Sequence, residues 1–178
     1  MNRVKVRALG ARVSERGRRT GLALLQLAIL LPLLFLLLFG VIDFGRLLLA
    51  KNEIAALSRE GGNLASRGTP FDQTIRAIFS ASGSSDLNQN GCIILTAVER
   101  GPGGHPVVTE QQVAGHHPRP SRVGSLGNPA TVPVPQLPRP GKVLVVAEVY
   151  MNYSAVTPIA SFLGQGMPAF AYDSAYFY

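Results

Sequence analysis

The chain has 178 residues, of which 47% are hydrophobic, with a single cysteine and a formal net charge of +7. This length allows one long helix and one small domain, and leaves no room for a second large core. The charge is concentrated: residues 1–21 carry seven basic residues and one acidic residue, whereas residues 68–178 carry six of each. Because no basic excess remains for a folded surface, nucleic acid is not expected as a partner.

Residues 22–42 form an apolar run without a charged residue, in which only Gln26 is strongly polar. As a helix this run is about 31 Å long, enough to cross the hydrocarbon core of a bilayer. The basic leader, residues 1–21, predicts a cytoplasmic N-terminus and an extracytoplasmic C-terminal part, with the protein in the cytoplasmic (inner) membrane. A signal peptide has a shorter apolar region followed by a small-residue cleavage site, so a retained single-pass anchor is favoured.

The helix is expected to be one long rod that ends near Gly68, preceded by a flexible tail over residues 1–20. Pro32 lies inside the apolar run, where it removes a backbone hydrogen bond and predicts a kink. Over residues 43–68 an amphipathic stripe continues the helix into water. The stripe is interpreted as the core that holds an outer sheet, with a seam between subunits as the alternative; its members are Leu47, Ala50, Ile54, Leu57, Gly61 and Leu64.

The remaining residues, 69–178, predict a small extracytoplasmic α+β domain with a mainly antiparallel sheet packed on the exposed half of the long helix. A second helix should begin with Thr69 as N-cap and Pro70 at its first position. Residues 118–141 hold seven of the thirteen prolines, which predicts a long surface loop. Residues 157–164 are expected to form a short helical or irregular piece. β-branched runs or alternation predict four strands, at residues 92–98, 106–113, 142–153 and 170–178. The first two should form a hairpin across the glycine-rich turn 101–104.

Two local features leave alternatives open. Asp43 and Arg46 lie one helical turn apart at the end of the apolar run, and form either an interfacial pair with Arg46 reaching the headgroups or a contact with a neighbouring helix. Cys92 has no partner for a disulfide within the chain, so it is either a buried apolar residue or a link between chains.

No catalytic, cofactor or metal site is expected, and the protein is not expected to be an enzyme. The sequence contains no nucleophile elbow, no phosphate-binding loop and no paired carboxylates near a histidine. Residues 86–91, DLNQNG, match the opening of a calcium loop, but its twelfth position would be Ala97, and Glu99 comes two residues late, which favours a turn. His105, His116 and His117 lie in loops without a carboxylate or cysteine partner.

The motifs around the apolar run together resemble the TadE-like family of minor pilins or pseudopilins of tight-adherence pili. The resemblance is carried by a basic leader ending in RRTG, a mid-span Leu31-Pro32, the exit motif DFGR at 43–46 and the motif SREG at 58–61. The C-terminal stretch KVLVVAEVYMNYSAVTPI, residues 142–159, is also similar to such proteins. Close similarity covers roughly a third of the chain.

This resemblance implies a membrane protein of tight-adherence (Flp-type) pilus assembly, whose partners are pilus or pseudopilus subunits, the assembly machinery and a prepilin peptidase. Cleavage after Gly21 would leave Leu22 as the new N-terminus. The fifth mature residue would then be Gln26, where such pilins usually have glutamate, and glutamine cannot neutralise a terminal ammonium in lipid. An uncleaved, membrane-resident scaffold or binding domain outside any filament is therefore the alternative.

Overall fold

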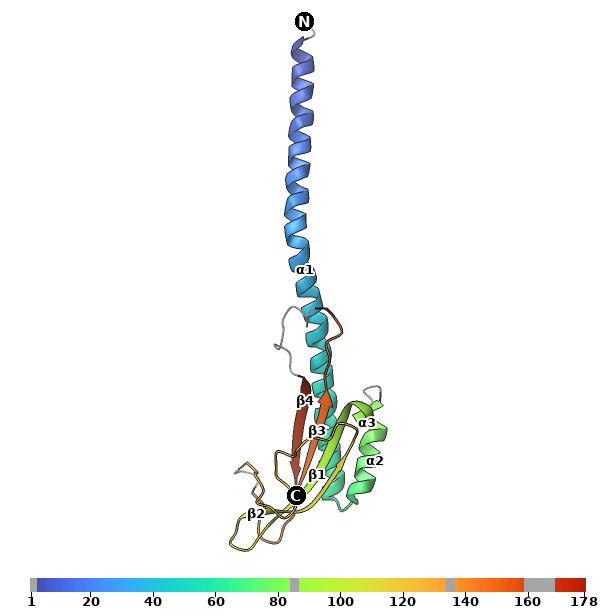
Figure 1. Cartoon of the computed structure of the whole chain (residues 1–178), viewed down its shortest axis with the longest axis vertical. Coiled ribbons are helices and arrows are strands. Elements are labelled where there is room, and N and C mark those ends of the chain that lie inside the picture. Colours follow the sequence, from blue (N-terminus) through green and yellow to red (C-terminus); the bar gives the residue numbers. More distant parts are fainter. Residues whose placement is uncertain (1–2, 84–86, 134–136, 159–168) are drawn as a thin grey trace.

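The computed structural model describes residues 3–83, 87–133, 137–158 and 169–178, with side chains described from residue 20 onward. The N-terminal half of the first helix stands clear as a rod, and its C-terminal half packs on a small head domain, defined here as residues 69–178 (Figure 1). The predicted α+β class is confirmed. The elements are α1 (Arg3–Ser66), α2 (Phe71–Ala81), α3 (Leu87–Asn90), β1 (Gly91–Arg100), β2 (Pro106–Ala114), β3 (Leu144–Asn152) and β4 (Phe170–Phe177).

Helix α1 begins earlier than the sequence predicted, because the expected flexible tail is helical from Arg3. Once a helix is nucleated, each further residue adds one hydrogen bond at low cost, and the tail is rich in arginine, which favours helix. The helix continues through Pro32 and ends at Ser66, close to the predicted end of the rod. The kink at Pro32 stays a prediction.

The four strands form one antiparallel sheet in the order β2-β1-β3-β4. The predicted hairpin joins β1 to β2, and Gly103 and Gly104 in its turn have φ angles of 88° and 82°, which glycine adopts without steric cost. β3 lies inside the sheet between β1 and β4, as the strong apolar run at 142–153 indicated.

The inner face of the sheet packs against α1 and α2 and forms the main core. Ile54 and Leu57 of the predicted stripe are buried there, and Ala50 packs against them. Gly61 and Gly62 bring α1 very close to its neighbours: a Cβ on Gly61 would lie 2.5 Å from Cδ1 of Ile78, and one on Gly62 would lie 2.5 Å from Cδ2 of Phe177. The core interpretation of the stripe is therefore confirmed for Ile54 and Leu57, whose side chains are at most 4% exposed.

Helix α2 starts one residue later than predicted. Pro70, with ψ of 143°, occupies the N-cap position, no side chain caps the helix, and Phe71 is the first helical residue. The prediction of Thr69 as N-cap is wrong, because Pro70 keeps an extended ψ and its carbonyl accepts the first helical hydrogen bond, from the Thr74 N–H at 2.9 Å. The apolar face is as expected, with Ile75 and Ile78 buried.

The proline-rich segment covers the outer face of the sheet. Within its described residues it forms no strand, as predicted, but it is more than a surface loop: Val123 and Ala130 are buried against Val98, Leu144 and other outer-face residues. It also shields the edge of β2, where the Val108 N–H donates to the Asn128 carbonyl at 3.1 Å.

Cys92 is fully buried beside Ile94 and Tyr150 on the same outer face, which supports the first of its two alternatives. Residues 159–164 of the predicted helical or irregular piece lie outside the described residues.

Candidate functional site at the helix exit

Asp43 joins the long helix to the head domain. Its side chain is fully buried, and its carboxylate accepts hydrogen bonds from the Val156 N–H at 3.0 Å, the Thr157 N–H at 3.3 Å and the Thr157 hydroxyl. Its backbone carbonyl accepts a hydrogen bond from the Tyr153 hydroxyl at 2.6 Å. We call these four residues, Asp43, Tyr153, Val156 and Thr157, the Asp43 clasp. The clasp fixes the chain after β3 to the point where α1 leaves the predicted span.

The electrostatics of the clasp favour the ionised carboxylate. The Thr157 hydroxyl holds the pKa of Asp43 below its usual value, and the two backbone N–H groups and the Arg46 charge act in the same direction, against the opposing effect of burial. A buried carboxylate is stable only when its oxygens are hydrogen-bonded, and here both are.

Arg46 lies one turn further along α1 and is exposed. Within the described residues, no ion pair joins it to Asp43, whose oxygens are engaged by the chain after β3. The structure thus pairs the Asp43 carboxylate with the chain after β3, a partner that neither sequence-based alternative included. A contact between Arg46 and a neighbouring helix stays a prediction.

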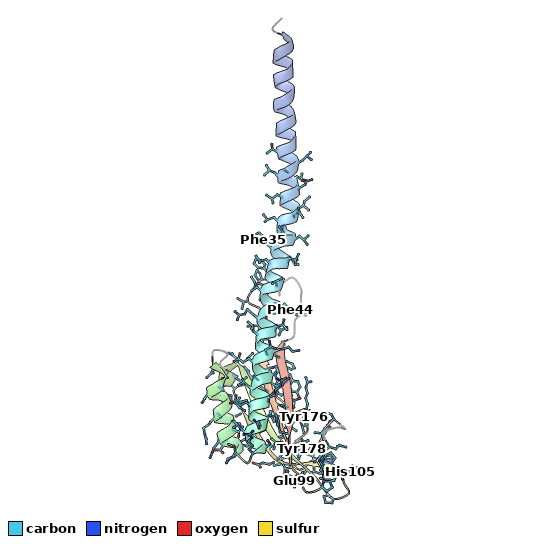
Figure 2. The ribbon with its side chains drawn as sticks, turned by 180° about the vertical axis from the view of Figure 1, so that it is seen from behind. Phe35, Phe44, Glu99, His105, Tyr176 and Tyr178 are labelled. Atoms are coloured by element: carbon cyan, nitrogen blue, oxygen red, sulfur yellow. The ribbon has the colours of Figure 1, made fainter. Side chains whose placement is uncertain are left out.

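The residues predicted for processing lie on the free part of α1. Leu22 is 56% exposed, Gln26 is exposed, and no atom outside the helix backbone approaches the Cβ position of Gly21 within 4 Å. The apolar side chains of residues 22–42 project outward without packing on the head (Figure 2). This helix is long and apolar enough to span a membrane. Cleavage after Gly21 stays a prediction.

A second polar site, around Glu148 on β3, was missed by the sequence analysis. Glu148 is fully buried on the outer face, and its carboxylate accepts hydrogen bonds from the Ser121 hydroxyl, the Arg122 N–H at 2.9 Å and the Tyr172 hydroxyl at 3.1 Å. A lone carboxylate within an otherwise apolar central strand was the available signal. Since its donors come largely from the proline-rich segment, Glu148 anchors that segment to the sheet.

Two aromatic residues complete the Glu148 site. Burial, reinforced by the nearby Glu148 charge, raises the pKa of Tyr150 to about 12. Burial also raises the pKa of Tyr172, whose ring carries the Arg122 guanidinium at 3.9 Å from its centroid. These contacts hold the proline-rich segment in place on the sheet.

The structure describes most of the candidate metal ligands, but it does not describe Asp86. Within the described residues, no three His, Cys, Asp or Glu side chains are grouped to hold a metal ion. Asp86 lies outside the described residues, so the calcium loop stays untested; Leu87 next to it is buried, and the Asn88 carbonyl accepts a hydrogen bond from the His116 N–H at 3.0 Å. Glu99 and His105 lie at the end of the head that is distant from the span (Figure 2).

The fold and the helix exit define a class of protein: an α+β head carried by one long N-terminal helix with a candidate membrane span. Residues 21–63 match the family model described as TadE-like protein, which confirms the resemblance over that segment. The match extends from the predicted cleavage position through the span and the clasp aspartate to the close-packed glycines, and it indicates a role related to the tight-adherence pilus. No curated protein and no solved structure matches the chain.

Proposed function

We propose that this protein is a minor pilin or pseudopilin-like membrane protein in the assembly of a tight-adherence (Flp-type) pilus. It acts without catalysis, through helix packing and protein–protein contacts with other pilus or pseudopilus subunits and the assembly machinery. The observation that carries the proposal is the TadE-like match over residues 21–63, the segment that contains both the apolar span and the helix exit.

The exposed apolar helix supports an anchoring role. Side chains such as Leu24 and Ile29 are 63% and 68% exposed, and burying an apolar side chain of this size in lipid or against another helix is worth roughly 1.5–3 kcal/mol. The proposed topology is a single pass through the cytoplasmic membrane with residues 1–21 inside and the head outside, as the net charge of the leader favours.

The Asp43 clasp supports a role for the head in recognition. Because the clasp and the close-packed glycines hold the head against α1 at several points, the head keeps a defined orientation relative to the membrane. A subunit that recognises its neighbours laterally needs such a fixed orientation.

The second candidate function is a signal-anchored scaffold or binding domain that never enters a filament. The observation that favours it is Gln26, which hydrogen-bonds a terminal ammonium but carries no charge to neutralise it. The two candidates differ in whether the chain is cleaved between Gly21 and Leu22.

The experiment is intact-mass measurement with N-terminal sequencing of the protein recovered from membranes of its native host. A chain that starts at Leu22 supports a pseudopilin processed by a prepilin peptidase. A chain that retains residues 1–21 contradicts processing and favours the scaffold. A Gly21→Leu variant is the matched control, because Gly21 has open space around it and its replacement should block cleavage without disturbing the fold.

A further inference from the structure

A groove opens between α1 and the end of β3 with the residues that follow it, close to the helix exit. Its volume is about 510 Å³, within the range typical of small-molecule sites. One wall is a single face of α1, formed by Arg46, Leu49, Ala50 and Glu53. The opposite wall is formed by Asn90, Met151, Asn152, Tyr153 and Ser154.

The depth of this groove relative to the bilayer follows from the helix. Arg46 is four residues past the predicted span, which ends at residue 42, so it lies about 6 Å beyond the hydrocarbon boundary along the axis. The headgroup layer on each side of a bilayer is about 5–7 Å thick. The groove therefore begins at the depth of lipid headgroups, whichever side of the membrane the head occupies.

The chemistry of the groove is both apolar and charged. Leu49 is 69% exposed, and Ile42 and Phe35, which lie on the same face of α1, continue the exposed apolar surface back into the span at 43% and 48%. In the described part of the chain, neither Arg46 nor Glu53 takes part in an ion pair, and the Asp43 carboxylate beside Arg46 is engaged by the clasp.

The order of the two charges matches one kind of lipid. Arg46 is nearer the span, and Glu53 follows seven residues later, two turns or about 10 Å further from the bilayer. A zwitterionic phospholipid presents its phosphate next to the glycerol and its amine further out. A primary ammonium donates hydrogen bonds to a carboxylate, whereas a choline group has no N–H and prefers an aromatic cage. Among the described residues that line this groove, Tyr153 alone is aromatic.

We propose that this groove binds one phosphatidylethanolamine molecule, with its phosphate at Arg46, its ammonium at Glu53 and its acyl chains along the exposed apolar face of α1. The bound lipid fills the space between α1 and the head just beyond Asp43, on the side of the clasp away from the span. This inference rests on the membrane anchoring contained in the proposed function.

The test is native mass spectrometry of the full-length protein in detergent micelles that contain equal amounts of phosphatidylethanolamine, phosphatidylglycerol and phosphatidylcholine. The wild type should retain one phosphatidylethanolamine in preference to the other two lipids. Arg46→Gln and Glu53→Gln should each lower that retention roughly tenfold, since each removes one charge-assisted contact. Glu53→Lys should shift the preference to phosphatidylglycerol, because the outer end of the groove becomes positive.

Lys51→Gln and Glu60→Gln are the matched controls: both side chains are exposed on α1 and neither lines the groove, so retention should not change. Equal retention of the three lipids by the wild type, or groove variants that behave like the controls, would overturn the proposal. Carbonate extraction of host membranes separates this failure from that of the proposed function. Extraction of the chain would refute its anchoring, whereas an integral chain without lipid preference refutes only the groove.

Discussion

Replacement of Gly61 by alanine tests the close approach of α1 to the head. In an open helix this change stabilises by roughly 0.5–1 kcal/mol, because alanine loses less backbone entropy. Here the new Cβ would lie 2.5 Å from Cδ1 and 3.3 Å from Cγ1 of Ile78, a residue without solvent exposure. The nearer contact is about 1 Å too short for carbon atoms, so Ile78 must leave its packed position.

The magnitude follows from these opposing effects. Forcing an extra methyl group into a packed core costs roughly 1–3 kcal/mol. After subtraction of the gain in helix propensity, Gly61→Ala should lower the free energy of unfolding by about 1 kcal/mol. Ile78→Val removes the Cδ1 atom in question, so the double variant should be more stable than the sum of the single effects, by about 1 kcal/mol of coupling.

The free energy of unfolding is measured by urea unfolding of the full-length protein in detergent micelles. Tyrosine fluorescence reports on the head, because all five tyrosines lie there and the chain has no tryptophan. Gly45→Ala is the matched control, since nothing lies within 4 Å of its Cβ position, and it should stabilise rather than destabilise. If Gly61→Ala stabilised as much as Gly45→Ala and showed no coupling to Ile78→Val, the packing argument would be refuted.

Three further perturbations address the clasp and the Glu148 site. Asp43→Ala should remove the acceptor for the Val156 and Thr157 N–H groups and lower their protection in amide hydrogen exchange. Glu148→Ala should lower the free energy of unfolding by roughly 2–4 kcal/mol, because the Arg122 N–H and the Ser121 hydroxyl lose their buried acceptor. Raising the pH should destabilise the head through Tyr150: its contribution is fully present below the ordinary pKa of 10.0 and is lost as the pH rises through about 12, since the unfolded chain releases the proton first.

Each of the three perturbations has a control variant and a result that would contradict the expected effect. Asp72→Ala breaks only an exposed pair with Arg76, so equal exchange at residues 156–157 in both aspartate variants would speak against the clasp. Glu99→Ala removes an exposed carboxylate, and a Glu148→Ala protein as stable as Glu99→Ala would contradict the anchoring role. For the pH dependence, Tyr150→Phe should reduce the alkaline loss of stability, and an unchanged alkaline transition would count against the assignment to Tyr150.

Elements with a strong local pattern could be predicted from the sequence. The apolar run, the stripe of Ile54 and Leu57, and the turn glycines Gly103 and Gly104 are each encoded by neighbouring residues. β1, β2 and the part of α1 after the leader appear where those patterns place them, whereas the helical leader from Arg3 was predicted to be flexible. The start of α2 was misplaced by one residue, because the sequence alone does not fix the ψ of Pro70.

The contacts of the candidate site could not be predicted in this way. Asp43 and Thr157 are 114 residues apart, and no local property of either stretch indicates that they meet. Glu148 is a lone carboxylate in an otherwise apolar strand, and a charged side chain is ordinarily exposed. Its burial depends on the proline-rich segment folding over the outer face, which composition alone described as a surface loop.

The central claim is that this protein takes part in assembly of a tight-adherence pilus. The most direct test is to count surface pili by electron microscopy in the native host after deletion of the gene, with the wild-type gene returned as the control. Pili should be lost on deletion and restored by the wild-type chain. A deletion strain with pili in normal number and length would contradict it.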